Sequence, residues 1–264
     1  MLKVAIDAGH GMNTPGKRCL LAIDPQQTRE WYLNDRIADK LENLLKEYDC
    51  KVLRVDDTTG REDVPLAERV NTANAWGADV YISIHHNAGI AGKSGGGTVV
   101  FYYSSKTERA KQAEALYEAV INETKLVGNR ASKVTKYGYY VLKNTNMPAF
   151  LIENGFMDST TDVPVILSED HATKTANGLL AFLINNFDLK KLESKAEIKN
   201  DGSFLVKILV DNLNVRAGAG TNYRANTVVQ KGQVFTIVQV SGSWGKLKSG
   251  AGWINISSKY VKRL

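Results

Sequence analysis

The stretch V-A-I-D-A-G-H-G at residues 4–11 runs from a short apolar strand into a histidine. The stretch V-Y-I-S-I-H-H-N-A at residues 80–88 repeats this pattern, with His85 and His86 near its end. In an open parallel sheet, sites are built at the carboxyl ends of the strands. The chain has only four histidines, and three of them lie at these predicted strand ends. Because neutral histidine is the commonest metal ligand, the pattern indicates a metal site.

Two acidic residues are candidate partners for these histidines. Glu30 lies on the first long amphipathic segment, and Glu153 follows the apolar run 149–152 and precedes a predicted turn at 154–156. A carboxylate at the end of an apolar strand is costly unless it is paired or lies near a metal. Each residue also has a plainer interpretation, because a lone loop histidine is more often hydrogen-bonded than ligating and a helix glutamate is usually solvated.

Several motifs in a fixed order give a more specific signal than any one of them alone. They are D-A-G-H-G at 7–11, a glutamate on the next helix, L-A-E-R-V-N-T-A-N at 66–74, S-I-H-H-N-A at 83–88 and I-E-N-G-F-M at 152–157. Together they resemble the zinc-dependent N-acetylmuramoyl-L-alanine amidases of the amidase-3 type, over roughly residues 1–187. The resemblance implies cleavage of the amide between N-acetylmuramic acid and L-alanine in peptidoglycan. It also implies Zn²⁺ held by His10, Glu30 and His85, with Glu153 as the catalytic carboxylate.

Zinc catalysis needs three protein ligands and one open position, which this set would supply. On a continuing strand, His85 and His86 point to opposite faces, so only one can readily ligate. The motif match favours His85 and leaves His86 as an alternative ligand or substrate contact. For His171, near the start of the last predicted helix, we expect a capping or surface role. Glu153 would take a proton from water and later deliver one to the leaving nitrogen.

Four further residues lie within or beside these motifs. Asp7 has two open interpretations, a partner that orients a ligand imidazole or a turn-forming residue. For Arg69 and Asn74 we expect a structural role in bracing loops near the site. Asn87 is expected to fix the turn after His85.

The fold class expected for residues 1–187 is α/β, with a mostly parallel sheet flanked by helices, because strand and helix patterns alternate. Thr28 is a plausible N-cap for the first helix. The expected strands are 4–6, 51–55, 80–85, 98–103, 139–142 and 149–153, and the expected helices are about 28–48, 65–76, 107–125 and 169–186.

Residues 204–264 follow a different pattern, with short β-branched runs separated by Gly, Asn and Ser. This is typical of a small all-β barrel. The segments L-N-V-R-A-G at 213–218, S-W-G-K at 243–246 and G-W-I at 252–254 resemble a bacterial SH3 (SH3b) domain, a family that commonly binds the cell wall. Trp244 and Trp253 could stack on sugar or peptide, as could Tyr223 and Tyr260. In so small a barrel we expect at least one tryptophan in the core.

The charged segment at 188–203 is predicted to be a linker between the two domains. Charge also divides there, since residues 191–264 carry 12 Lys and Arg against 4 Asp and Glu, while the whole chain has a net charge of +6. No nucleic-acid motif accompanies this basic excess. Peptidoglycan and anionic wall polymers are therefore the expected partners, bound in part by salt-sensitive attraction.

Composition places further limits on the chain. No apolar run approaches the ~20 residues that span a bilayer, so no membrane insertion is expected. Cys19 and Cys50 lack metal-ligand spacing and are expected to be reduced thiols. The N-terminus enters a strand at once without a signal-peptide pattern, which predicts cytoplasmic synthesis followed by release onto the wall.

These features leave several functions open. The leading hypothesis is a peptidoglycan amidase of the phage-endolysin type. A host amidase that lyses the mother cell would carry the same features. A zinc peptidase acting within the stem peptide and a non-catalytic wall-binding protein are the alternatives from other classes. The sequence indicates no particular oligomeric state.

Overall fold

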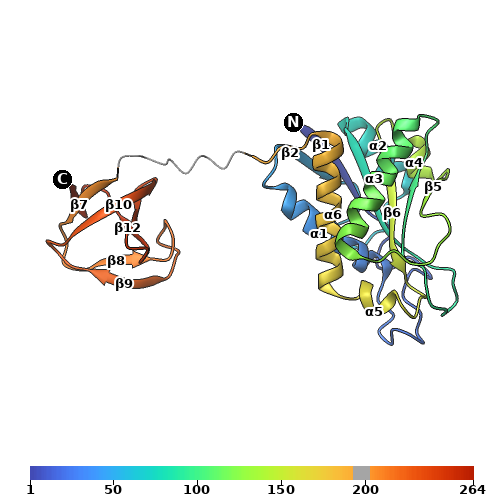
Figure 1. The fold of residues 1–264 in the computed structure, drawn as a ribbon, viewed down its shortest axis with the longest axis horizontal. Helices are drawn as coiled ribbons and strands as arrows, with labels where there is room; N and C mark the ends of the chain where they lie inside the picture. Colours follow the sequence, from blue (N-terminus) through green and yellow to red (C-terminus); the bar gives the residue numbers. More distant parts are fainter. Residues whose placement is uncertain (193–202) are drawn as a thin grey trace. The chain divides into compact units, whose positions relative to one another are not determined.

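The computed structural model describes residues 1–192 and 203–264, and it divides into two compact units, Met1–Leu192 and Glu193–Leu264 (Figure 1). Most of the expected linker, 193–202, lies outside the described residues. The residues just before it pack on the first unit. The side chain of Leu189 is buried in its core, and the carbonyl of Lys190 accepts a hydrogen bond from the N–H of Asp49.

The first unit alternates strands and helices. Its elements are β1 (Leu2–Ala8), α1 (Glu30–Leu45), β2 (Cys50–Arg54), α2 (Leu66–Trp76), β3 (Val80–Asn87), β4 (Thr98–Tyr102), α3 (Thr107–Thr124), β5 (Val134–Lys136), α4 (Tyr140–Asn144), β6 (Ala149–Phe156), α5 (Val163–Ile166) and α6 (Glu169–Phe187). The six strands form one sheet in the order β2-β1-β3-β6-β4-β5. Among the described strand pairs of this sheet, only β4–β6 is antiparallel, so the prediction of a mostly parallel sheet flanked by helices is confirmed.

The two faces of the sheet follow from the alternation of side chains along each strand. In β1, Val4 and Ile6 face the core formed with α1, α3 and α6. Ala5 faces the smaller core formed with α2 and α4. Helices therefore cover both faces, and none of the described helices is long and apolar enough to cross a membrane. Cys19 and Cys50 are free thiols, as expected.

Two local predictions are wrong. Thr28 is not the N-cap of the first helix, because α1 begins at Glu30 with Arg29 at the cap position. The backbone N–H of Thr28 is instead bound by the side chain of Asp24, 2.7 Å away, which keeps this residue in the preceding turn. The segment Tyr140–Asn144 is the helix α4 rather than a strand, and β5 supplies the edge strand. Short apolar runs fit either structure, and packing of α4 against α2 decides this one.

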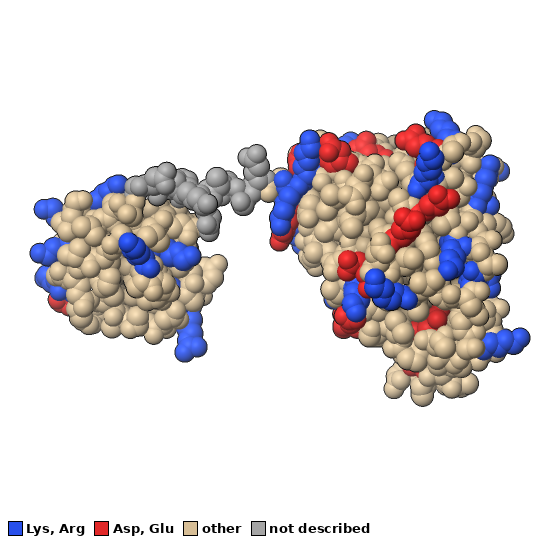
Figure 2. Space-filling model, viewed as in Figure 1, with Lys and Arg blue, Asp and Glu red and all other residues tan. Residues whose placement is uncertain are grey.

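The second unit is an antiparallel sheet, as expected for an SH3-like barrel. Its strands are β7 (Phe204–Ile208), β8 (Leu213–Arg216), β9 (Ala225–Val229), β10 (Val234–Ser241), β11 (Trp244–Leu247), β12 (Trp253–Asn255) and β13 (Val261–Arg263). They pair in the order β13-β7-β10-β11-β12-β8-β9. On the face of this unit seen in Figure 2, basic side chains outnumber acidic ones.

The expectation of a core tryptophan in this unit is wrong. Its fully buried side chains are all aliphatic, and both Trp244 and Trp253 are only half-buried. The reason is strand alternation, because the neighbours Gly245 and Ile254 occupy the inward positions. Both indole rings are therefore partly accessible to a ligand.

Candidate metal centre

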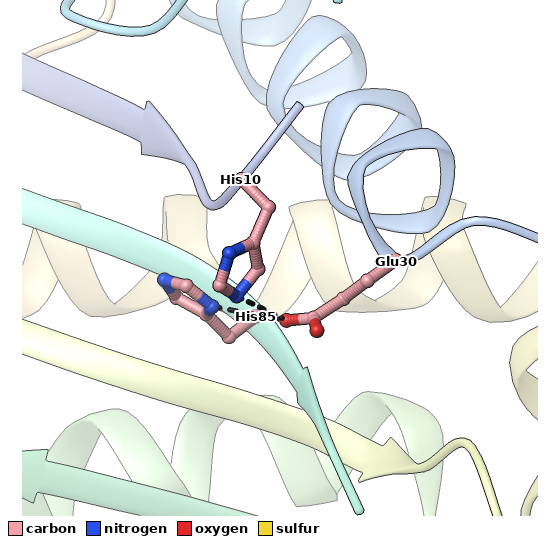
Figure 3. A group of neighbouring side chains, drawn as sticks. All are labelled: His10, Glu30 and His85. Carbon is pink, nitrogen blue, oxygen red and sulfur yellow. Dashed lines mark hydrogen bonds and ion pairs between the residues drawn. The ribbon is translucent and has the colours of Figure 1, made fainter. Parts of the chain in front are cut away.

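Three of the predicted site residues meet at the carboxyl ends of β1 and β3. His10 follows β1, Glu30 is the first residue of α1, and His85 lies in β3. Glu30 Oε1 is 3.4 Å from His10 Nε2 and 3.0 Å from His85 Nδ1. One ligand atom from each residue lies within 4.8 Å of the others. Figure 3 shows both imidazoles and the carboxylate pointing toward one common point.

The backbone before His10 allows this close approach. A Cβ at Gly9 would overlap the imidazole ring of His85, so only glycine fits there. His10 itself has a φ of +69°, in the left-handed region that costs a non-glycine residue free energy. The ring centroids of His10 and His85 lie 4.9 Å apart, nearly perpendicular to each other. The turn therefore brings two imidazoles edge to face.

Asn34 connects the three segments that carry these residues. It lies one helical turn after Glu30, and its Nδ2 donates to the carbonyl of Gly9 at 3.0 Å. Its Oδ1 lies 2.7 Å from Nδ1 of His86, the residue that follows His85. The sequence reasoning missed Asn34, although its i+4 spacing from Glu30 placed it on the same helix face.

Glu30 is held as an anion. Burial by itself would raise its pKa, but hydrogen bonds and charge from His10 and His85 hold the pKa well below its usual range. The Lys17 ammonium lies 3.6 Å from Oε2, the carboxylate oxygen of Glu30 that is not the one near the imidazoles. Two imidazoles and one buried carboxylate form a donor set of the kind that zinc prefers, with room for a further ligand.

Glu153 lies beside His85, because the two residues are register partners in the adjacent strands β6 and β3. Both line a cavity of about 550 Å³ together with His10. Burial raises the pKa of Glu153 to about 7, with Glu30 adding to the rise while His85 and Lys17 oppose it. Its Oε2 has no hydrogen-bond partner among the described residues. A carboxyl group with such a pKa can both accept and donate a proton near neutral pH.

The turn predicted directly after Glu153 is wrong, because β6 continues through Phe156. The pairing of β3 with β6 instead shifts by one residue, from His85–Glu153 to Asn87–Phe156. Such a bulge re-aims the side chains beside it. Asn87 helps to hold the following loop, as expected, since its side chain accepts a hydrogen bond from the N–H of Ala88.

The same cavity contains residues that the sequence did not single out. Lys17, from the long loop after His10, and the tyrosines Tyr139 and Tyr140 line its wall. Lys17 lies in a segment without periodicity, so no local pattern marked it. Tyr140 is 44% exposed, which leaves an aromatic face at the rim of the cavity.

His86 lies on the other face of β3 and is not part of the ligand group. Its ring is buried against Asn34, and burial holds its pKa well below the usual range. His171 is also buried, so the expected surface role is wrong. Its Nε2 lies 3.2 Å from the carbonyl of Asn154, and burial lowers its pKa to about 4. The helix cap at this position is Ser168, which accepts the His171 N–H.

Asp7 follows neither of its two expected interpretations. Its carboxylate is buried and accepts hydrogen bonds from Arg69, Tyr81 and Ser83, and none from an imidazole. Arg69 also donates to the carbonyl of His10 at 3.1 Å. Arg69 therefore braces the loop that carries His10, as expected.

Asn74 also has the expected structural role. Its side chain bonds the carbonyl of Asn144 at 3.0 Å and the N–H of Asn146 at 2.9 Å. These contacts tie α2 to the end of α4, the helix whose first residue, Tyr140, lines the cavity.

Comparison with protein families gives two matches that together cover most of the chain. The family model Amidase_3, described as N-acetylmuramoyl-L-alanine amidase, matches residues 4–196. A second model, described as bacterial SH3 domain, matches residues 211–262. The boundary between the matches falls near the division into two compact units.

Curated relatives include proteins of bacteria and of a phage. The chain is 31% identical to the N-acetylmuramoyl-L-alanine amidase CwlM of Bacillus licheniformis, over 83% of this chain and 82% of that protein. It is 30% identical to an endolysin of Bacillus phage SPP1, over 98% of this chain and 97% of that protein.

Solved structures resemble the first unit. An N-acetylmuramoyl-L-alanine amidase from Clostridium difficile 630 is 28% identical, with a TM-score of 0.63, and the match covers 71% of this chain and 97% of that one. The catalytic domain of CwlV, an amidase from Bacillus (Paenibacillus) polymyxa, is 25% identical with a TM-score of 0.63, over 72% of this chain and 100% of that one.

Proposed function

The chain belongs to the Amidase_3 family of N-acetylmuramoyl-L-alanine amidases, and from this premise we propose that it hydrolyses peptidoglycan through a zinc site formed by His10, Glu30 and His85. The amidase activity cleaves the bond between N-acetylmuramic acid and the L-alanine of the stem peptide. The observation that carries the proposal is the convergence of two imidazoles and a buried carboxylate beside a second buried carboxylate, Glu153.

The donor set fits zinc. Glu30 Oε2 is buried without a hydrogen-bond partner among the described residues, and Oε1 lies near both imidazoles. The Lys17 ammonium at 3.6 Å from Oε2 offsets part of the cost of burying this anion, and Oε1, which lies between the two imidazoles, is the oxygen placed to bind a metal. When bound, zinc supplies polarisation of the scissile carbonyl and a lower pKa for an attacking water.

Other residues of the chain have the remaining roles, which are proton transfer, positioning of the ligands and contact with the substrate. Glu153 takes a proton from the attacking water and delivers one to the leaving nitrogen, a role supported by its place beside His85 in the wall of the same cavity. Arg69 and Asn34 hold the backbone on either side of His10 in place. Tyr139 and Tyr140 offer aromatic faces to a sugar or peptide at the rim.

Metal content and lysis, measured together, distinguish the role of Glu30 as a metal ligand from the role of Glu153 in proton transfer. Chelation should abolish lysis and added Zn²⁺ should restore it. Glu30→Gln should lose bound zinc because it weakens a ligand. Glu153→Gln should retain zinc and lose turnover by about 10²–10⁴-fold. Glu68→Gln, at an exposed site on α2, is the matched control and should retain both. Retained zinc in Glu30→Gln, or full activity in a verified metal-free preparation, contradicts the site.

The bond that is cleaved distinguishes the amidase from a zinc peptidase acting within the stem peptide. Mass spectrometry of digested peptidoglycan should find free N-terminal L-alanine on the stem peptides and no new reducing sugars. New termini further along the peptide would instead support the peptidase.

The SH3 unit is proposed to bind the cell wall, and the whole chain to act as a lysis enzyme of the endolysin type. The phage relative matches both units, which supports this role. Residues 203–264 have their own core, so they can be tested alone. They should sediment with purified walls without digesting them, and binding should weaken as salt rises if anionic polymers contribute. If this fragment stays in the supernatant at all salt concentrations, the binding role is wrong.

A further inference from the structure

A second cavity lies next to the metal centre on the same face of the sheet. It measures about 610 Å³ and shares Asn87 with the first cavity. Its floor comes from Val99 and Phe101 of β4 and Thr135 of β5. In the register of β4 and β6, Val99 is the partner of Glu153. The two cavities are therefore neighbours across a single strand pair.

The walls of this second cavity are tied together. The N–H of Gly96 donates to the side chain of Asn129 at 2.9 Å, which joins the loop after β3 to the loop after α3. A Cβ at Gly97 would overlap the backbone of Gly128, so the two loops touch through glycines. The guanidinium of Arg130 lies over the ring of Phe156, 5.3 Å from its centroid. The cavity is thus a formed feature with a positioned cation.

The lining of this cavity is basic. Lys93 and Arg130 line it, and none of its lining residues is acidic among those that the structure describes. Within the same described ranges, neither cation forms an ion pair, although the first unit is rich in ion pairs elsewhere. An arginine and a lysine that line one cavity without an ion-pair partner are suited to bind a carboxylate, because the guanidinium can bind it through two parallel hydrogen bonds.

The distance from Glu153 indicates which carboxylate reaches this cavity. Adjacent strands are about 4.8 Å apart, so β5 lies roughly 10 Å from Glu153 across β4. An extended peptide covers about 3.5 Å per residue, so the side of the cavity formed by β5 lies about three residues along a stem peptide whose first bond is at the metal centre. The third residue of that peptide is either diaminopimelate, which carries a free side-chain carboxylate, or lysine, which carries an ammonium group.

We propose that Lys93 and Arg130 form a subsite for the carboxylate of diaminopimelate at the third position of the stem peptide, so that the enzyme prefers such walls to those with lysine. This rests on the proposed amidase function. The discrimination has two sources, attraction of the carboxylate and repulsion of the lysine ammonium by two like charges.

The test compares soluble muramoyl tetrapeptides that differ only at the third residue, with the metal-loaded enzyme. The kcat/KM for the diaminopimelate substrate should exceed that for the lysine substrate by about tenfold or more, as expected for two charge-assisted contacts. A Lys93→Ser/Arg130→Ser double variant should lose this discrimination. Lys111→Ser, an exposed lysine on α3, should keep it. Zinc content and circular dichroism check that the variants fold.

A second pair of substrates carries D-isoglutamine in place of D-glutamate at the second position, which removes the nearer carboxylate. The preference should persist in this pair. The inference is overturned, while the amidase function stands, if the preference depends on the second residue instead. It is also overturned if the diaminopimelate and lysine substrates are cleaved equally well. Cleavage of neither substrate at the muramoyl–alanine bond would overturn the proposed function and the inference with it.

Discussion

The buried pair of Arg69 and Asp7 gives the sharpest prediction about stability. Both side chains are almost fully buried, and Arg69 also donates to the carbonyls of Val64, Ala8 and His10. Arg69→Met would leave the Asp7 carboxylate without its cation in the interior. Removing one partner of a buried pair typically costs about 3–5 kcal/mol, so we expect the free energy of unfolding of the first unit to fall by about 4 kcal/mol.

The dependence of this loss on pH has a definite sign. Burial by itself would raise the pKa of Asp7, but Arg69, His85 and Ser83 hold it below its usual value. In the variant burial dominates, the pKa rises, and the carboxyl group takes up a proton as the pH falls. The penalty at pH 7 should therefore shrink as the pH is lowered toward 4. A loss that is constant with pH would show that the missing hydrogen bonds, and not the buried charge, are responsible.

Urea unfolding of four proteins measures the coupling free energy between Arg69 and Asp7. They are the unmodified chain, Arg69→Met, Asp7→Asn and the double variant, followed by a near-ultraviolet signal of the first unit. The double variant should lose less than the two single losses added together, with a coupling of about 2 kcal/mol. Arg61→Met, at an exposed arginine, is the matched control and should change stability by about 0.5 kcal/mol or less. If Arg69→Met costs less than about 1 kcal/mol, the argument from burial is wrong.

Two further predictions concern the residues around the site. His171 has a folded pKa of about 4 against an ordinary 6.5, so its contribution to stability is complete above pH 6.5 and is lost as the pH falls toward 4; the total is about 3 kcal/mol. His171→Gln should flatten the stability–pH curve in that window, and an unchanged slope would exclude it as the source. Asn34→Ala should weaken zinc affinity by about 10–100-fold, measured by competition with a chromophoric chelator. The melting temperature of the metal-free variant shows whether a lower affinity reflects a loss of folding instead. An unchanged zinc affinity would contradict the prediction and would mean that Asn34 only fills space.

The sequence by itself determined where the chemistry is carried. The apolar runs before His10, His85 and Glu153 predict strands, and strands of an α/β sheet deliver their last residues to one edge. The alternation of side chains also predicted that only one of His85 and His86 could join the metal ligands. Each of these inferences depends on a pattern within about ten residues of the chain.

The tertiary structure decided what depends on contacts between distant segments. No local pattern predicts that Lys17 comes within 3.6 Å of Glu30 or that Asn34 bonds the carbonyl of Gly9. The same holds for α4, whose short apolar run becomes a helix because it packs on α2. Propensity over five residues is too weak to fix either structure, and long-range packing supplies the difference.

The second cavity is the clearest case of this kind. Its position depends on the strand order, which inserts β6 between β3 and β4 and so places Val99 beside Glu153. Lys93 and Arg130 are separated by 37 positions in the sequence and line one cavity because their two loops touch at Gly97 and Gly128. Strand order is set by the total free energy of burying both faces of the sheet, which is a property of the whole unit. The residues proposed to perform the reaction could therefore be found from the sequence, while the residues proposed to select the substrate required the fold.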